Sequence, residues 1–206
     1  MQQRSSGRYN ICLHSMVHPR KIFGGMGNQM FQMAYIYSQM REGNIPDIYL
    51  QDPKYFDKFG GEIKNLYGGG VGKTDKIAIH VRRGTNPTNP NEPAYYENPF
   101  YVNLCATDYY ERAIAMFPSS EFIVFSDDIE WCKQQEIFKG CEFSEGLNEI
   151  DDLNKMASCR GHIIANSSYS WWGAFISPHG GKVVAPKDWF ADGVERTKCP
   201  TNWIRV

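Results

Sequence analysis

An apolar run that closes on two arginines and a glycine stands near the middle of the chain: Ile77-Ala78-Ile79-His80-Val81-Arg82-Arg83-Gly84. A short continuous apolar run bounded by a turn signal is typical of a strand buried on both faces of a parallel sheet. Three later stretches have the same form, residues 121–125, 162–165 and 182–185. The sequence therefore predicts four buried strands.

Helical patterns separate these predicted strands. They cover residues 109–117, 129–139, 151–158 and 169–176. Strands that alternate with helices predict an α/β fold with a parallel sheet over residues 76–206. Ligands bind such sheets at the carboxyl ends of the strands, and three polar clusters fall there: residues 80–84, 126–128 and 166–170.

The first 75 residues have a weaker pattern. A short strand is predicted at 21–23, then a glycine-rich turn, a helix from Met30 to about Arg41, and a brief strand at 48–50. Residues 51–75 are rich in aromatic residues and then in glycine, which predicts a loop or linker between lobes. We therefore expect a reduced N-terminal lobe over residues 1–75 and a larger lobe over residues 76–206.

Composition places the chain among globular proteins. It has 206 residues, of which 42% are hydrophobic and 22% charged. Lys and Arg number 22 and Asp and Glu 23, a net charge of -1, which weighs against a broad basic surface for nucleic acid or anionic membranes. The sequence shows neither an apolar run of membrane-spanning length nor a signal peptide, so a cytoplasmic protein is expected.

The six cysteines have no metal-binding pattern. No two of them are separated by the two to four residues that a zinc ligand pair requires. An even number allows disulfides, but a chain with this much apolar content does not need them, so free thiols are favoured. No metal site is predicted.

The cluster His80-Val81-Arg82-Arg83-Gly84 suits a phosphate ligand. Alternation along a strand puts His80 and Arg82 on one face, and a guanidinium matches phosphate oxygens with two hydrogen bonds. Gly84 lets the backbone turn beside a ligand. The alternative is a strand end with solvated arginines.

A second cluster, Asn166-Ser167-Ser168-Tyr169-Ser170, joins a predicted strand to a helix. Backbone N–H groups at a helix N-terminus bind anions, and serine hydroxyls add donors. The alternative is simple capping of the helix by Ser167 or Ser168. The following pair, Trp171 and Trp172, favours a buried helix face over a platform for sugars.

Carboxylates form two further clusters. Asp127 and Asp128 follow a strand and could hold a ribose or a metal, although capping of the next helix is favoured for either one alone. Glu149, Asp151 and Asp152 lie around the start of the helix predicted over residues 151–158. A carboxylate there could accept two hydrogen bonds from a guanine edge, or could simply occupy the first helical turn.

Residues 68–74 resemble the phosphate-binding loop of nucleoside triphosphatases. That motif needs a glycine where Tyr67 stands, and a helix directly after Thr74. The strand at 77–81 leaves no room for this helix, so a triphosphatase is disfavoured.

Several stretches together resemble the α-1,2-fucosyltransferases of glycosyltransferase family 11, and they occur in the family's order. They are residues 24–32, 80–84, 125–128, 131–133, 152–153, 164–174, 185–186 and 189–190. The resemblance implies a GT-B-like fold with Rossmann-like lobes, the N-terminal one on the acceptor side. It also implies a metal-independent, inverting transfer of L-fucose from GDP-β-L-fucose to a galactose hydroxyl of a glycan. GDP-fucose would be the donor substrate, with no separate cofactor.

The same resemblance assigns the site residues. Arg82 would be the catalytic residue that stabilises charge on the leaving GDP, supported by His80. Asp152 matches a position that reads guanine. The donor-binding set is Gly25, Gly27, Asn28, Arg83, Gly84, Asp127, Asp152, Asn166, Ser167, Ser168 and Tyr169.

Two departures from the family pattern bear on catalysis. Thr85 stands where the family usually has an acidic residue, which leaves Asp108, Glu92 and Glu97 as alternative acids near the acceptor. The distance along the chain from Asn28 to Arg82 is also shorter than usual. A non-catalytic module that binds GDP-sugars or glycans is therefore the alternative function.

Overall fold

A computed structural model describes residues 25–42, 52–85 and 93–206. The helices are α1 (Met26–Glu42), α2 (Gly60–Gly68), α3 (Tyr109–Ala115), α4 (Ile129–Lys133), α5 (Glu149–Ala157) and α6 (Ser168–Phe175). The strands are β1 (Thr74–Val81), β2 (Phe122–Ser126), β3 (Glu142–Phe143), β4 (Cys159–Ile163), β5 (Val183–Ala185) and β6 (Ile204–Arg205). Short 3-10 turns cover Pro53–Tyr55, Asp57–Phe59, Leu104–Ala106 and Glu136–Phe138. None of the described helices is long and apolar enough to cross a membrane.

The six strands form one sheet in the order β3-β2-β1-β4-β5-β6, and every neighbouring pair is parallel. This confirms the predicted α/β fold with a parallel sheet. The order is that of Rossmann-type sheets, which start in the middle, build one half and then cross to the other half. The crossing point lies between β1 and β4, and such sheets bind ligands at the carboxyl ends of these two strands.

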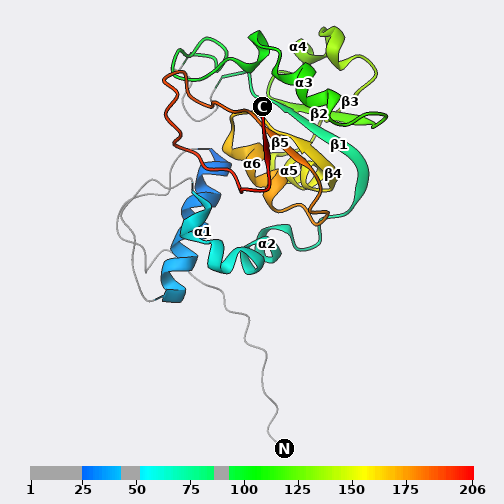
Figure 1. The fold of residues 1–206 in the computed structure, drawn as a ribbon. Coiled ribbons are helices and arrows are strands. Elements are labelled where there is room, and N and C mark those ends of the chain that lie inside the picture. The colour runs from blue at the N-terminus through cyan, green and yellow to red at the C-terminus, as the bar shows by residue number, and fades with distance from the viewer. Residues whose placement is uncertain (1–24, 43–51, 86–92) are drawn as a thin grey trace, which may run out of the picture.

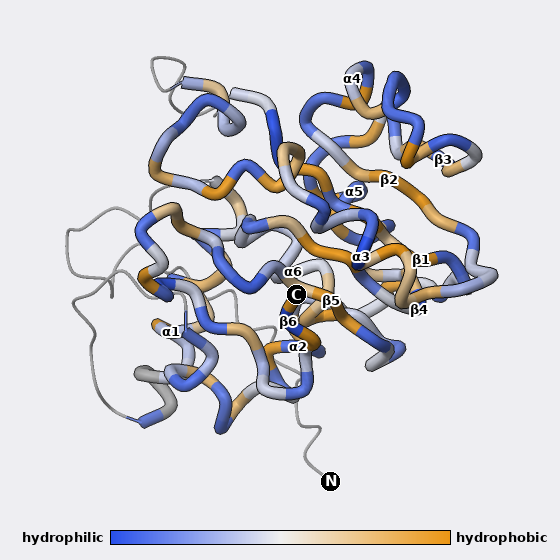
Figure 2. Tube along the Cα trace, turned by 45° about the horizontal axis from the view of Figure 1, so that its top comes forward, coloured by the Kyte–Doolittle hydropathy of each residue, from blue (hydrophilic) through white to orange (hydrophobic). Residues whose placement is uncertain are grey.

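Helices cover both faces of the sheet (Figure 1). On β1, Ile77 and Ile79 belong to an apolar cluster with residues of α3 and α4. Ala78 instead packs in a cluster with Met156 of α5. The strand therefore alternates between the two faces, as a doubly covered strand must. Figure 2 shows hydrophobic residues along β1 and β2 and hydrophilic residues over the turns around α4.

The tryptophan pair lies in the largest part of the core. The ring centroids of Phe31 in α1 and Trp171 in α6 are 4.6 Å apart, and those of Phe56 and Trp172 are 5.6 Å apart in a stacked arrangement. All four rings are buried, so the predicted core role of both tryptophans is confirmed. Since Ile63 of α2 joins the same cluster, α1 and α2 pack on α6. The division into lobes at residue 75 stays a prediction.

The prediction of a loop over residues 51–75 is wrong. The segment contains α2 and two 3-10 turns, of which the first is capped by the Asp52 side chain, which accepts from the Lys54 N–H at 3.0 Å. The glycine content of this segment predicts against a helix, because glycine has a low helix propensity. The helix forms because the burial of Phe56 and Ile63 outweighs that low propensity. Gly70 then leaves the helix with φ 90°, a conformation that favours glycine.

Other boundaries differ by smaller amounts. The helix α1 begins at Met26, inside the stretch that was predicted as a glycine-rich turn. The helix predicted over 129–139 divides into α4 and a separate 3-10 turn. The strands β3 and β6 were not predicted, and the expected strands at 21–23 and 48–50 lie outside the described residues.

Candidate functional site

The polar clusters predicted at strand ends meet at one edge of the sheet. Val81 at the end of β1 pairs with Ser126 of β2, which brings Arg82 beside Asp127. On the other side β1 pairs with β4, whose chain continues into the turn before α6. The sites predicted from the separate stretches 80–84, 126–128 and 166–170 thus share the crossing point of the sheet.

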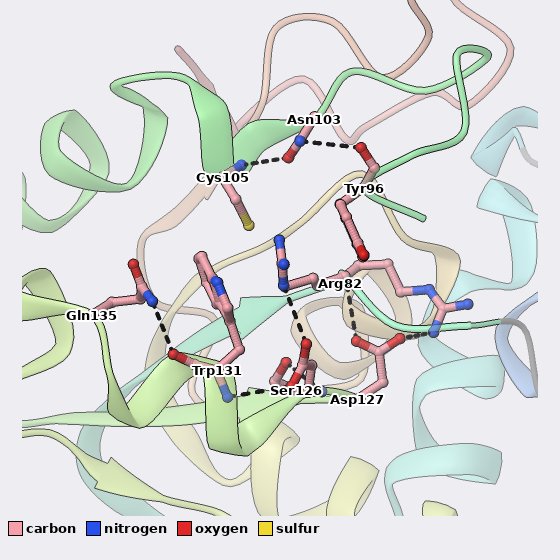
Figure 3. A network of polar contacts seen from close by, with 10 residues as sticks. Arg82, Tyr96, Asn103, Cys105, Ser126, Asp127, Trp131 and Gln135 are labelled. Carbon is pink, nitrogen blue, oxygen red and sulfur yellow. Dashed lines mark hydrogen bonds and ion pairs between the residues drawn. The ribbon is translucent and has the colours of Figure 1, made fainter. Parts of the chain in front are cut away.

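Arg82 is held by a carboxylate and an aromatic ring. Its Nη1 forms an ion pair with Asp127 Oδ2, and its guanidinium lies 5.3 Å from the centre of the Tyr95 ring. In Figure 3 Arg82 extends toward Asp127, on the side of the network away from Trp131. The other oxygen of Asp127 accepts the Arg83 backbone N–H at 2.9 Å. A Cβ at Gly84 would lie 3.1 Å from Asp127, so glycine suits this close approach.

Arg83 lies between two aromatic rings. Its guanidinium carbon is 3.9 Å from the centre of the Tyr96 ring and 4.2 Å from that of the Trp131 ring. Its Nε donates to Asp128 Oδ2 at 3.2 Å. The two ring contacts and the Nε hydrogen bond thus hold this guanidinium within the protein, and the backbone N–H is taken by Asp127, so the role of Arg83 in donor binding stays a prediction.

Asp128 also has a local structural role. Its Oδ1 accepts the backbone N–H of Trp131 at 3.3 Å and so caps α4. The capping interpretation is therefore confirmed for Asp128. Asp127 instead belongs to the arginine network, as Figure 3 shows.

His80 is buried and neutral. The pKa of His80 is lowered to about 4, chiefly by burial; the Asp127 charge raises it and the Arg82 charge lowers it. The ring centroid lies 5.7 Å from that of Tyr169. Within the described part of the chain, Nδ1 has no hydrogen-bond partner. A buried polar atom without a partner is costly, so Nδ1 is a candidate contact for a ligand.

The N-terminus of α1 touches that of α6. Ser168 Oγ donates to Asn28 Oδ1 at 2.7 Å. A Cβ at Gly27 would lie 2.5 Å from both Ser168 C and Tyr169 N, so only glycine permits this approach. Gly25 is exposed, with nothing within 4 Å of an added Cβ. Two helix N-termini side by side present N–H groups and positive dipole ends to one region.

Asn166 fixes the turn before α6. Its Nδ2 donates to the backbone carbonyls of Val102 at 2.9 Å and Trp189 at 3.0 Å. Its own carbonyl accepts the Tyr95 hydroxyl at 2.6 Å. Ser167 is the N-cap residue of α6 by position, but its side chain makes no capping hydrogen bond. The capping alternative is therefore wrong for the Ser167 hydroxyl.

Asp152 lies half-buried in the first turn of α5. Its Oδ1 accepts the Ser144 hydroxyl at 2.6 Å, and its Oδ2 accepts the Tyr169 hydroxyl at 3.3 Å. Burial raises the pKa of Asp152, and these two hydrogen bonds oppose the rise. The Tyr169 hydroxyl also lies 2.8 Å from the Glu149 carbonyl oxygen, so it is shared between two acceptors.

The aromatic and hydroxyl partners of the site were not predicted from the sequence. They are Tyr95, Tyr96, Trp131, Ser144 and the side chain of Tyr169. The signal for the first two was an adjacent pair of tyrosines in a loop otherwise rich in proline and asparagine.

No contact among the described residues places the alternative acids near Arg82. Asp108 pairs with Arg112 at 3.0 Å and its side chain is 71% exposed. Glu97 and Thr85 are exposed, and Glu92 lies outside the described residues. Among the described residues, no group of three or more His, Cys, Asp or Glu could hold a metal ion.

Comparison with known proteins identifies the family. Residues 54–206 match Glycosyl transferase family 11. The chain belongs to this glycosyltransferase family. The family match covers the site residues from His80 to Tyr169, whereas Gly25, Gly27 and Asn28 precede it.

Two curated relatives of this family 11 chain come from Escherichia coli. One is named Alpha-1,2-colitosyltransferase, with 36% identity over 149 residues, 65% of this chain and 48% of the relative. The other is named O-antigen biosynthesis glycosyltransferase WbnK, with 33% identity over 138 residues, 63% of this chain and 44% of the relative. The chain thus spans about half the length of the curated relatives it matches.

The stretch that imitates a phosphate-binding loop leads directly into a strand. β1 begins at Thr74, whose backbone N–H donates to the Ser158 carbonyl at 2.8 Å. No helix follows Lys73, as predicted. A hollow of 340 Å³ lies here, lined by Gly69–Gly72 and the end of α5, at the amino end of β1 and away from Arg82.

Proposed function

We propose that this family 11 chain binds GDP-β-L-fucose at the carboxyl ends of β1 and β4 and transfers fucose to a galactose hydroxyl of a glycan. The observation that carries the proposal is a chain of contacts: Arg82 lies over the Tyr95 ring, and the Tyr95 hydroxyl donates to the Asn166 carbonyl in the turn before α6, whose N-terminus meets that of α1. An always-charged guanidinium and two positive helix ends suit a diphosphate. The reaction would be inverting and metal-independent.

The proposed chemistry places negative charge on the leaving GDP. The acceptor oxygen attacks the anomeric carbon on the face opposite the phosphate, the bond from that carbon to the phosphate oxygen breaks, and the hydroxyl proton of the acceptor passes to solvent water. Arg82 would stabilise the charge that develops on the β-phosphate. Asp127 and Tyr95 would keep Arg82 in place before the reaction, which lowers the cost of reorganisation. His80, neutral at pH 7, would donate or accept one hydrogen bond rather than supply charge.

The test is calorimetric titration of GDP and GDP-fucose without added metal, on the unchanged chain and on Arg82→Ala. A charged hydrogen bond contributes about 1.5–3 kcal/mol, so we expect Arg82→Ala to weaken GDP binding about 10- to 100-fold. Arg112→Ala is the matched control, because Arg112 is exposed and pairs only locally with Asp108. A folded, unchanged chain that binds no GDP would contradict the proposal.

A second assay separates an enzyme from a binding module. Release of GDP in the presence of a galactoside acceptor supports transfer, whereas GDP binding without release favours the non-catalytic alternative. Exposed Thr85 at the usual acidic position is the observation that favours this alternative. Because one relative is named a colitosyltransferase, GDP-linked fucose and colitose are compared as donors.

A further inference from the structure

The carboxylate of Asp152 is clamped by two hydroxyl groups from different elements. Ser144 follows β3 and donates to Oδ1 at 2.6 Å, and Tyr169 lies in the first turn of α6 and donates to Oδ2 at 3.3 Å. The shorter distance is typical of a hydroxyl that donates to a charged carboxylate. The Ser144 hydroxyl therefore fixes Oδ1, while the single Tyr169 proton is shared between Oδ2 and the Glu149 carbonyl and restrains Oδ2 less strongly.

Both donors are themselves fixed. Ser144 is 6% exposed, and its backbone N–H donates to the Val124 carbonyl of β2 at 2.9 Å. The Tyr169 ring packs near His80, and its hydroxyl also donates to the Glu149 carbonyl at 2.8 Å. Asp152 is thus attached both to the sheet and to the turn that carries Ser168.

The Asp152 carboxylate can accept more hydrogen bonds than the Ser144 and Tyr169 hydroxyls donate to it. An ionised carboxylate has about four lone-pair sites on its two oxygens, and the two hydroxyls take one on each oxygen. Within the described residues Asp152 makes no ion pair, although burial makes its charge costly. One open acceptor on each oxygen fits a neutral ligand with two adjacent N–H donors.

We propose that Ser144 and Tyr169 are positioning residues that aim both oxygens of Asp152 at the paired N–H donors of a guanine ring. This inference rests on the proposed GDP donor. Guanine carries a ring N–H next to an exocyclic amino group, whereas hypoxanthine lacks the amino group. A correctly aimed carboxylate therefore separates GDP from inosine diphosphate, and a carboxylate that has lost its orientation does so less well.

The experiment measures the affinities of GDP and inosine diphosphate for the unchanged chain, Ser144→Ala and Tyr169→Phe. We expect the unchanged chain to prefer GDP by about tenfold or more, since an unmade hydrogen bond to a buried charged group is costly. Each variant should weaken GDP binding about three- to tenfold, change inosine diphosphate binding less, and so reduce the preference. The effect of Ser144→Ala should be the larger, because Tyr169 shares its hydroxyl with Glu149.

Matched controls come from the same chain. Ser158→Ala removes a hydroxyl that donates to the Lys155 carbonyl at the far end of α5. Tyr37→Phe removes a hydroxyl that donates to Glu62 away from the sheet edge. Neither control should change the preference for GDP. Ser144→Thr keeps the hydroxyl and should retain the preference that Ser144→Ala loses.

The outcomes are distinct. An equal loss of affinity for both nucleotides in both variants would show a merely structural role and overturn the inference. Equal binding of both nucleotides by the unchanged chain would overturn it as well. If the unchanged, folded chain binds neither nucleotide, the result contradicts the proposed GDP donor and therefore also this inference. If Ser144→Ala does not fold, Tyr169→Phe alone decides the result.

Discussion

Gly27→Ala is the substitution whose effect the structure defines most closely. The added methyl carbon would lie 2.5 Å from Ser168 C and Tyr169 N, and 2.7 Å from Ser168 Oγ. Two of these three atoms belong to the backbone of α6, so no side-chain rotation relieves the overlap. The two helix N-termini must move apart, which also breaks the hydrogen bond from Ser168 to Asn28.

Three contributions, two unfavourable and one favourable, determine how much Gly27→Ala changes the free energy of unfolding. Overpacking costs about 1–3 kcal/mol, and the lost hydrogen bond costs about 1 kcal/mol. The exchange of glycine for alanine inside a helix returns up to about 1 kcal/mol. The net loss of unfolding free energy is about 1–3 kcal/mol, which corresponds to a decrease in Tm of roughly 2–12 °C for a chain of this size.

The assay is urea unfolding combined with GDP titration. Gly25→Ala is the matched control, because nothing lies within 4 Å of a Cβ there, and it should leave stability nearly unchanged. Gly27→Ala should lower both the unfolding free energy and the affinity for GDP, since the separated helix ends no longer face one ligand. Equal stability of the two variants would refute the close contact between α1 and α6.

Three further outcomes are expected. Arg83→Lys should lower the unfolding free energy by about 1–2 kcal/mol in urea, because lysine cannot stack between Tyr96 and Trp131, whereas Arg112→Lys on the exposed face of α3 should have little effect. Burial lowers the pKa of both His80 and His162 to about 4 from 6.5, so the unfolded chain binds more protons and the unfolding free energy should fall as pH decreases from 6.5 toward 4; a flat profile across this window would contradict the two buried, neutral imidazoles. Lys73→Ala should leave GDP affinity unchanged, because Lys73 leads into β1 at the opposite end of the strand from Arg82; a large loss would revive the phosphate-loop interpretation.

The long strands could be predicted because burial on both faces gives them continuous apolar runs. β1, β2, β4 and β5 were all found in this way. β3 and β6 have two residues each, too few for any pattern, and they exist because β2 and β5 offer them a pairing edge. The helix α2 was missed for a related reason, since the tertiary contacts of Ile63 outweigh its glycine-rich sequence.

The site could be predicted where it follows from topology, and not where it follows from side-chain partners. Parallel strands bring their carboxyl ends together, so the placement of residues 80–84, 126–128 and 166–170 at one edge followed from the strand assignments, whereas the pairing of Arg82 with Asp127 needed the strand order. The partners of Arg83 and Asp152 are rings and hydroxyls from loops far along the chain. Tyrosine, tryptophan and serine are common in any core or turn, so their type carries no signal until the fold places them.

Arg82 and Arg83 are neighbours in the sequence but have different partners in the structure. Arg82 and Arg83 directly follow β1, and successive side chains along an extended backbone point to opposite sides. In the structure the Arg83 guanidinium stacks between the Tyr96 and Trp131 rings, and Arg82 lies beside Asp127 and Tyr95. The Arg83 backbone N–H donates to the same carboxylate that pairs with Arg82. Because Arg83→Lys keeps this backbone N–H and loses only the stacking between Tyr96 and Trp131, it should leave Arg82 in position and lower kcat far less than Arg82→Ala does.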